Sequence, residues 1–320
     1  MPEQSLFLSI MMIGVMVTIS SSSWFTSWMG LEMNTLAFIP MMADQSNKMT
    51  NEAMLKYFLT HTLASTMLLI PTMTTTSMMS TWMNPPNTII FIALAMKMGA
   101  APQHFWLPQV MEGLSWQLNM VLATIQKINP IFMMTLTKSS MNSSAAILSL
   151  LSGAIGGYNQ TSLRKLMAYS SISHMGGMMM AMMKSTSLVL VYITIYITIS
   201  VSTMMVFLKT KMSTTTQTPQ LTTMLMILMM LNMLSLGGLP PFLGFVPKWM
   251  LIKQFTETNM LMTLILISTS IVTLFFYLRI TYNKFLMSSL TEPKKFKMTK
   301  TPTIITIMAL LTLPLPMFMM

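Results

Sequence analysis

Long stretches without any charged side chain are the feature that most constrains how this chain folds. Four of them, residues 6–22, 187–208, 222–236 and 261–278, contain no Asp, Glu, Lys, Arg or His. A membrane-spanning helix needs roughly 20 predominantly apolar residues. Only 8% of the residues are charged, whereas a soluble domain usually carries about 25%. The pattern therefore predicts an all-α, polytopic integral membrane protein.

The hydrophobic segments follow one another along a single transmembrane domain that covers residues 1–320, without a soluble appendage. Short polar or proline-containing connections, such as residues 84–87, separate them. We count about eleven spans, with boundaries expected at 5–22, 24–43, 51–71, 87–109, 115–137, 142–158, 163–183, 187–208, 220–256, 259–280 and 302–318.

Basic residues are distributed unequally between the two sides that these spans define. Such a bias marks the inner side of a membrane protein, so we expect the N-terminus inside and the C-terminus outside. The net charge of +11 fits this bias, and no interleaving of aromatic and basic residues predicts a nucleic-acid surface. Lys138 and Lys184 lie on the outer side, and the inner side collects Lys48, Arg164, Lys165, Lys209, Lys211, Lys284, Lys294, Lys295, Lys297 and Lys300.

The sequence has few of the residue types that hold cofactors. It contains no cysteine, which excludes thiolate-held iron–sulfur clusters and Cys-ligated zinc. Neither the glycine-rich dinucleotide loop nor the P-loop pattern occurs, and the 3 histidines are scattered. We therefore expect this chain to bind no cofactor and no metal of its own.

Four ionisable residues lie within the predicted spans, far from the ends: Glu32, Lys97, Lys127 and Lys248. An intramembrane lysine or carboxylate costs at least ~2.5–3.5 kcal/mol on insertion scales, so the four together cost about 10–14 kcal/mol before pairing. Such residues usually face a bundle interior or a wet path and mark ion or proton routes. The alternative is a buried Glu–Lys pair that only fixes helix packing, but one acid cannot pair with three lysines.

The remaining ionisable residues of the spans carry a weaker signal. His104 follows a helix break and is interpreted either as a proton relay or as a hydrogen-bond staple. His174 lies among hydroxyl residues and glycines, and is either a relay or a packing residue. His61, alone on an apolar helix, is interpreted as structural. Lys56 and Lys253 lie near the membrane surface, where their long side chains can reach water.

Two of the predicted spans are broken by glycine and proline. Residues 99–102 (GAAP) follow Lys97, and residues 237–244 (GGLPPFLG) precede Lys248. Proline removes an amide donor and glycine permits unwinding, and irregular backbone at membrane depth is tolerated only where it is buried in protein or lines a wet cavity. A pair of interrupted segments in corresponding halves is typical of the site in transporters with inverted repeats. Each break beside a lysine therefore predicts a transport site.

Five motifs together resemble the family of mitochondrial NADH:ubiquinone oxidoreductase (respiratory complex I) chain 2, an antiporter-like family. They occur in the order expected for that family and extend over nearly the whole chain. The motifs are MGLEMN (29–34), KMGAAP with HFWLP (97–108), QKINP (126–130), AYSSISHMG (168–176) and LGGLPPFLGFVPKW (236–249).

The resemblance implies an antiporter-like architecture of two inverted five-helix repeats. Bacterial relatives have fourteen helices and animal versions lack the first three, which agrees with the eleven spans counted here. It also implies a place in the mitochondrial inner membrane, with the N-terminus in the matrix and the C-terminus in the intermembrane space. The expected partners are the other membrane-arm subunits and inner-membrane lipids. NADH, FMN, iron–sulfur clusters and ubiquinone are then expected on other subunits.

The same resemblance implies roles for the buried charges. Glu32 and Lys97 become the coupling pair of one half-channel, Lys127 the central connection, and Lys248 the lysine of the other half. Three positions depart from the family pattern: Gln103 replaces a commoner phenylalanine, Gln109 a glutamate and Gly177 a tryptophan. We therefore expect no acid to act at position 109, and a different packing beside His174.

The implied function is that of a core membrane-arm subunit, which couples electron transfer from NADH to ubiquinone with proton translocation through the buried Glu and Lys residues. The chain is then part of an enzyme, the H+-translocating NADH:ubiquinone reductase, without redox chemistry of its own. Two alternatives remain at this point: a stand-alone cation/proton antiporter that uses the same charges, and a structural scaffold in which they are relics.

Overall fold

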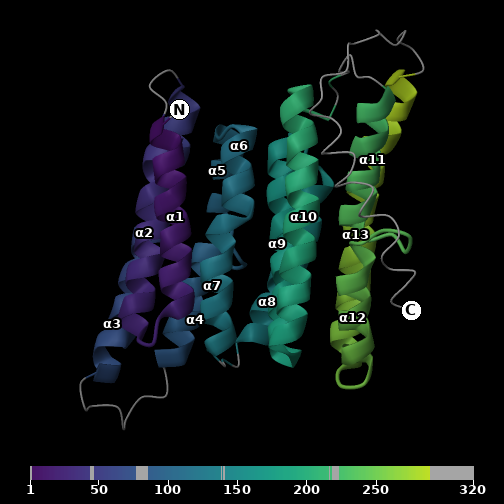
Figure 1. The fold of residues 1–320 in the computed structure, drawn as a ribbon. Coiled ribbons are helices and arrows are strands. Elements are labelled where there is room, and N and C mark those ends of the chain that lie inside the picture. Colours follow the sequence, from purple (N-terminus) through teal and green to yellow (C-terminus); the bar gives the residue numbers. More distant parts are fainter. Residues whose placement is uncertain are drawn as a thin grey trace. The chain divides into compact units, whose positions relative to one another are not determined.

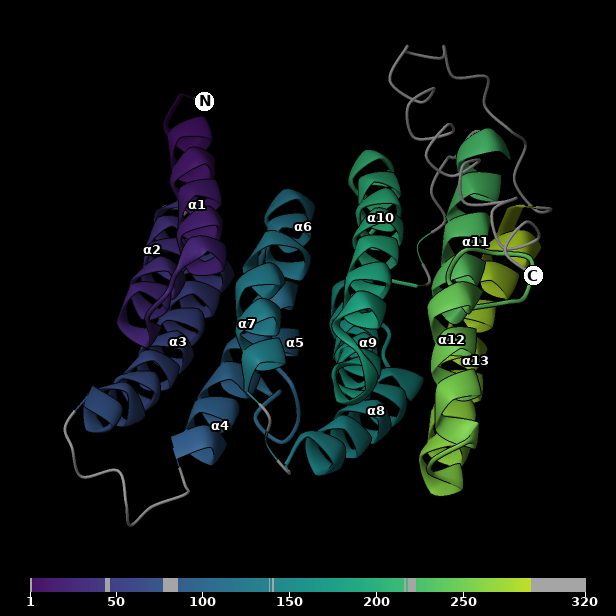
Figure 2. The same ribbon diagram turned by 60° about the horizontal axis from the view of Figure 1, so that its bottom comes forward.

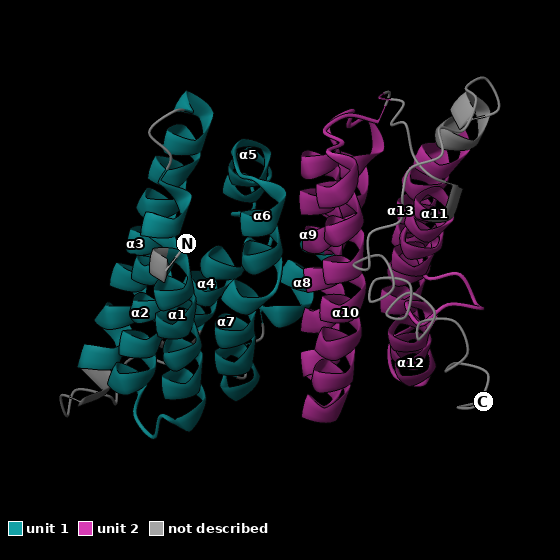
Figure 3. Cartoon of the chain, turned by 45° about the horizontal axis from the view of Figure 1, so that its top comes forward, with its two compact units in different colours: residues 1–149 teal, residues 150–320 magenta. Residues whose placement is uncertain are grey.

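The structure is a computed structural model, and its described residues form thirteen α-helices (Figure 1). The predicted all-α class is therefore confirmed. Contacts within the chain divide it into two compact units, residues 1–149 and 150–320, which are coloured separately in Figure 3 and described one at a time here. The described residues are 2–43, 47–76, 86–137, 139, 141–215, 217 and 223–288.

Unit 1 begins with α1, α2 and α3, which lie side by side in both ribbon views (Figure 1 and Figure 2). Two glycines bring α1 and α2 together, since a Cβ on Gly30 would lie 2.9 Å from the Gly14 carbonyl oxygen. Small residues at such crossings allow close helix packing in a membrane. The helices are α1 (Pro2–Ser20), α2 (Trp24–Met42), α3 (Lys48–Thr76), α4 (Pro86–Met98), α5 (Trp106–Gly113), α6 (Trp116–Ala123), α7 (Ile125–Leu136) and the first part of α8 (Asn142–Tyr158).

Unit 2 contains the rest of α8 and five more helices, in which α10 packs against α9, α11 and α12. Small residues again mediate the first crossing: a Cβ on Gly153 would meet the Ser173 backbone nitrogen at 2.6 Å, so α8 and α9 touch backbone to backbone there. The helices are α9 (Leu163–Lys184), α10 (Thr186–Thr210), α11 (Thr223–Gly237), α12 (Phe245–Thr256) and α13 (Met260–Ser288).

Several helices have the length and composition that a membrane span requires. Lys48–Met73, Thr186–Thr210 and Met260–Tyr282 are long and apolar enough to cross a bilayer. Large apolar side chains also cover their outer faces: Ile271 on α13 is 63% exposed and Leu190 on α10 is 63% exposed. Lipid chains are the solvent that suits such a surface.

The helices agree with most of the predicted spans, including both predicted breaks. Helix α4 ends at Met98 and α5 begins at Trp106, while α11 ends at Gly237 and α12 begins at Phe245. The prediction of one continuous helix over 115–137 is wrong, because α6 and α7 are separated at Thr124. The predicted span 302–318 and the basic segment 294–300 lie outside the described residues.

Candidate functional site

Lys97 occupies the last turn of α4, directly before the first break. The chain leaves the helix at Gly99, whose φ of 73° is a left-handed conformation that glycine adopts without strain. The Trp106 indole on α5 then reaches back and donates a hydrogen bond to the Met96 carbonyl, at 3.1 Å. The break is therefore an ordered structure, and it fixes the end of α4 that carries the lysine.

The carboxylate of Glu32, near the middle of α2, faces Lys97. The Glu32 Oε2 and Lys97 Nζ atoms are 3.7 Å apart, and the exposed fractions of the two side chains are 22% and 2%. The predicted closeness of these two residues is confirmed. A burial this complete is unusual for lysine and requires compensation by an opposite charge.

Lys127 lies in the first turn of α7 and is 4% exposed. The interruption before it, at Thr124, has φ −116° and ψ −81°. The Thr124 hydroxyl donates to the Met120 carbonyl at 2.7 Å, which offers the backbone an alternative to the helix ladder. Pro130 lacks an N–H, so the Gln126 carbonyl loses its usual helical partner as well. A third broken helix, missed by the sequence analysis, therefore accompanies a third lysine.

Buried polar side chains connect the helices that carry Glu32 and Lys127. Gln126 Nε2 donates to the Asn34 backbone oxygen at 3.3 Å, joining α7 to α2. The Thr18 hydroxyl donates to Asn129 Oδ1 at 2.9 Å, joining α1 to α7. Asn34 and Asn129 are both almost fully buried. Each asparagine follows a charged residue by two positions in its motif, which is the sequence signal that could have identified this network.

Lys248 belongs to unit 2 and extends from the first turn of α12 into the second break. Its ammonium donates a hydrogen bond to the Gly237 carbonyl at 2.9 Å. That carbonyl is available because the chain turns out of the helix at Gly238, where φ is 78°. A Cβ on Gly238 would lie only 2.9 Å from Lys248 Cδ, so the turn leaves room for the lysine.

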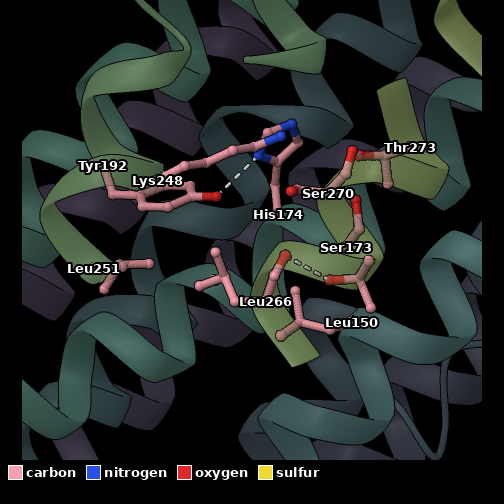
Figure 4. A pocket seen from close by; sticks show the side chains of 11 residues that line it. Leu150, Ser173, His174, Tyr192, Lys248, Leu251, Leu266, Ser270 and Thr273 are labelled. Atoms are coloured by element: carbon pink, nitrogen blue, oxygen red, sulfur yellow. Dashed lines mark hydrogen bonds between the residues drawn. The ribbon is translucent and has the colours of Figure 1, made fainter. Parts of the chain in front are cut away.

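A pocket within unit 2 brings Lys248 and His174 together (Figure 4). His174 Nδ1 lies 3.1 Å from the Tyr192 hydroxyl, within hydrogen-bond distance. Gly177 makes this contact possible, since a Cβ there would meet the Tyr192 hydroxyl oxygen at 2.6 Å. Hydroxyl side chains, including Ser270 and Thr273, complete the lining. The packing beside His174 thus depends on the glycine that departs from the family pattern.

The other two histidines lie in unit 1. His104 is buried in the first break, with Nδ1 at 3.2 Å from the Pro102 carbonyl oxygen, an arrangement that suits a hydrogen-bond staple. His61 on α3 is 5% exposed and lies against the Tyr57 ring, with 4.0 Å between ring centroids. Among the described residues, no three or more His, Asp or Glu side chains gather where they could hold a metal ion.

The structure therefore places Glu32, Lys97 and Lys127 in unit 1, and Lys248 with His174 in unit 2. Each unit combines lysine, buried in unit 1 and half-buried in unit 2, with irregular backbone, hydroxyl or amide side chains and carbonyl groups. Such a combination has the chemical groups that proton transfer between titratable side chains and their hydrogen-bond partners requires. Proton translocation through all four residues, Glu32, Lys97, Lys127 and Lys248, stays a prediction.

Comparison with known proteins identifies the family. The model described as NADH:quinone oxidoreductase/Mrp antiporter, TM, matches residues 21–276. The NADH-ubiquinone oxidoreductase chain 2 of Anopheles gambiae is 43% identical over 296 residues, which cover 89% of this chain and 87% of the relative. The protein of the same name from Salmo salar is 40% identical over 338 residues, with 97% and 95% covered.

Solved structures show the same fold. A chain of respiratory complex I from Thermus thermophilus with bound Aureothin superposes with a TM-score of 0.86 at 22% identity, covering 98% of this chain and 78% of that chain. A chain of the Mrp complex from Dietzia superposes with a TM-score of 0.79 at 17% identity, covering 91% and 61%. On these matches, the chain belongs to the family of NADH-ubiquinone oxidoreductase chain 2, within the broader NADH:quinone oxidoreductase/Mrp antiporter family.

Proposed function

We propose that protons pass through this membrane subunit of complex I along Glu32, Lys97 and Lys127 in unit 1 and Lys248 in unit 2. Family membership makes the chain part of NADH:ubiquinone oxidoreductase, in which proton translocation is coupled to electron transfer. The observation that carries the proposal is the Glu32–Lys97 pair, with its oxygen and nitrogen 3.7 Å apart and the lysine side chain 2% exposed.

A buried lysine beside a carboxylate can be switched between two protonation states. Burial disfavours the charged ammonium, whereas a nearby carboxylate favours it. When Glu32 is protonated or moves away, Lys97 therefore loses its stabilising charge and releases its proton. When the carboxylate returns, the lysine is reloaded. Lys248 is stabilised by a different partner, the Gly237 carbonyl, which favours an ammonium over a neutral amine for as long as the geometry of the break is kept.

Within unit 1, the buried amides provide the connection from the pair to Lys127. The link from Gln126 to the Asn34 backbone ties α7 to the helix that carries Glu32. Among the described residues, the buried atoms Asn34 Oδ1 and Asn129 Nδ2 have no hydrogen-bond partner in the protein, so each has the capacity to bind an internal water molecule. Amides that bind water near a titratable lysine support proton movement between Lys97 and Lys127.

His174 and His104 act as relays in this proposal. His174 shares a pocket with Lys248 and has the Tyr192 hydroxyl as its neighbour, so its ring can pass protons between the lysine and the hydroxyl-lined pocket. His104 lies in the first break, bonded to the Pro102 carbonyl through one nitrogen, which leaves the other for exchange.

The setting follows from the family and from the loop charges. We infer a multi-pass protein of the mitochondrial inner membrane, with one transmembrane domain over 1–320, about eleven spans and antiporter-like inverted repeats. The N-terminus faces the matrix and Met320 the intermembrane space, because basic residues concentrate on the N-terminal side. Other membrane-arm subunits and lipids surround it. Other subunits hold the flavin, iron–sulfur clusters and quinone, and no cofactor or metal is assigned to this chain.

The test is a Lys97→Met substitution in the assembled complex, reconstituted in proteoliposomes. Methionine has a similar length and no charge, so helix packing is retained while the proton carrier is lost. We expect NADH-driven proton uptake to fall about a hundredfold or more, the lower end of the range for loss of a proton-transfer group. Lys56→Met, at an exposed position of α3, is the matched control and should leave uptake unchanged.

Two results would contradict the proposal. Full proton uptake by the Lys97→Met complex would mean that the buried charges are structural. Cation-driven proton exchange by the purified chain alone, without the rest of the complex, would instead favour a stand-alone antiporter.

A further inference from the structure

His61 and Tyr57 occupy successive turns of α3 and are buried at a place where the sequence predicts only packing. Tyr57 is fully buried and His61 is 5% exposed. The rings stack on one another, and the Trp106 ring of α5 lies 5.0 Å from the His61 ring and 6.0 Å from the Tyr57 ring, between centroids. The aromatic carbon atoms of both residues are therefore well packed.

The polar atoms of Tyr57 and His61, in contrast to their carbon atoms, have no partners in the protein. In the part of the chain that the structure describes, the Tyr57 hydroxyl and both ring nitrogens of His61 are buried without any hydrogen-bond partner. An imidazole always has one N–H donor and one acceptor nitrogen, or two donors when charged. A histidine that only fills space would still place at least one of these nitrogens on a carbonyl or hydroxyl group.

The Glu32–Lys97 pair has the same deficit. Within the described residues, Glu32 Oε2 and Lys97 Nζ are buried and accept or donate no hydrogen bond, since their separation of 3.7 Å exceeds hydrogen-bond distance. Trp106, whose ring lies 5.0 Å from that of His61, donates a hydrogen bond to the Met96 carbonyl, so His61 packs beside the end of α4 that carries Lys97. Glu32, His61 and Lys97 come from α2, α3 and α4, which pack against one another in the order α2–α3–α4.

Five unsatisfied polar atoms, two of them in the ion pair itself, require an explanation. Buried polar atoms in proteins almost always have a partner, and where protein supplies none an ordered water molecule usually does. Water that bonds several such groups is retained because its removal would leave all of them unpaired. The acceptors and donors here are complementary: a carboxylate oxygen and one imidazole nitrogen accept, while an ammonium, a hydroxyl and the other nitrogen donate.

We propose that Tyr57 and His61 form, with Glu32 and Lys97, a binding site for ordered water that solvates the ion pair. The inference rests on the proposed function, and it assigns His61 a role that its sequence context does not indicate. Water held by His61 and Tyr57 lowers the cost of charge on Glu32 and Lys97 and bridges the gap that the pair leaves. The required property of His61 is hydrogen bonding through its nitrogens, while Trp106 and Tyr57 fix the ring in place.

Two substitutions separate this role from packing. His61→Phe keeps an aromatic ring between Tyr57 and Trp106 and removes both nitrogens, whereas His61→Gln removes the ring and keeps a donor and an acceptor. If His61 holds water, NADH-driven proton uptake by the reconstituted complex should fall roughly fivefold or more in His61→Phe and stay near the unsubstituted level in His61→Gln. Tyr57→Phe, which removes only the hydroxyl, should reduce uptake less than His61→Phe.

The reverse pattern overturns the proposal. Normal uptake in His61→Phe, with or without a defect in His61→Gln, would show that the residue acts through packing alone. Native gels report the amount of assembled complex, so uptake is expressed per assembled complex. The water itself is sought in a high-resolution electron microscopy map of the intact complex, within about 3.2 Å of a His61 nitrogen. A map that resolves water elsewhere in the chain but shows none there would also overturn it.

The Lys97→Met complex distinguishes a failure of the water site from a failure of the proposed function. If Lys97→Met loses proton uptake and His61→Phe does not, the water site is wrong and the proposed function stands. If both complexes pump normally, the proposed function itself fails.

Discussion

Lys97 in unit 1 and Lys248 in unit 2 occupy similar backbone settings and have different partners. Each lies beside a broken helix that turns at a glycine with positive φ, 73° at Gly99 and 78° at Gly238. Lys97 faces a carboxylate from another helix, at 3.7 Å. Lys248 donates to the carbonyl of Gly237, in the break next to its own helix, at 2.9 Å. One lysine is thus compensated by a charge and the other by a backbone dipole.

The difference decides how each site can be switched. A carboxylate can be protonated or withdrawn, so the partner of Lys97 can change its charge. A backbone carbonyl keeps its dipole, so Lys248 responds only when the geometry of the break changes. The described part of unit 2 has one acidic residue, Glu257, at the end of α12. Nine residues of helix separate it from Lys248, roughly 13 Å at 1.5 Å per residue, which is too far for pairing.

The largest expected effect comes from filling the break of unit 2. In Gly244→Ala the new Cβ would lie 1.7 Å from the Ser235 backbone oxygen, so the chain must move to accommodate it. We expect destabilisation of about 3 kcal/mol or more, as for severe overpacking, and loss of most assembled complex on native gels.

The other end of the same break provides the control. A Cβ on Gly237 would have its nearest neighbour at 3.6 Å, an ordinary contact, so Gly237→Ala should assemble normally. Equal tolerance of both substitutions would show that the break is not the rigid structure on which the Lys248 site depends.

Glu32→Gln is the next test and acts on the partner that only unit 1 has. Glutamine keeps the shape of the side chain and removes its charge, leaving Lys97 buried without compensation. Removal of one member of a buried pair costs about 3–5 kcal/mol when the other stays charged, and release of the Lys97 proton reduces this cost. We therefore expect the Glu32→Gln complex to assemble but to translocate protons poorly. The measurement is proton uptake per NADH oxidised.

Glu52→Gln is the matched control, because Glu52 is exposed near the start of α3. If Glu32→Gln pumped as well as this control, the carboxylate would not be the switch and the two units would work alike.

The sequence predicts the two broken helices well and the third poorly, for a physical reason. Glycine and proline change what the backbone can do wherever they occur, so the breaks after Lys97 and before Lys248 can be read from composition. At the interruption, the Thr124 hydroxyl donates a hydrogen bond to the Met120 carbonyl. Many threonines within helices make the same bond, and their helices continue. The one local signal is Pro130, and it lies six residues after the interruption.

The sequence also does not determine which side chains of different helices lie next to one another. A buried acid needs an opposite charge, but this requirement does not choose among three lysines, and the Glu32–Lys97 pair was predicted from the family resemblance. His61 has only apolar residues and hydroxyls near it along the chain, which favours a packing role. Trp106 of α5, however, packs on its ring and donates a hydrogen bond to the Met96 carbonyl, next to Lys97. The sequence likewise did not predict a role for Tyr192, because its partner His174 lies on a different helix, α9.

The smallest expected effect concerns that tyrosine and sharpens the comparison within unit 2. Tyr192→Phe removes the hydroxyl that lies 3.1 Å from His174 Nδ1 and keeps the ring. A hydrogen bond of this kind contributes about 0.5–1.5 kcal/mol, so proton uptake should fall roughly two- to tenfold while assembly is unchanged. Tyr196→Phe is the matched control: that ring packs on His174 at 5.2 Å between centroids, from the same helix. A relay through His174 requires the first substitution to slow proton uptake more than the second. Equal effects would mean that His174 is held by ring packing, and Lys248 would then be the one residue of the unit 2 pocket with a role in proton transfer.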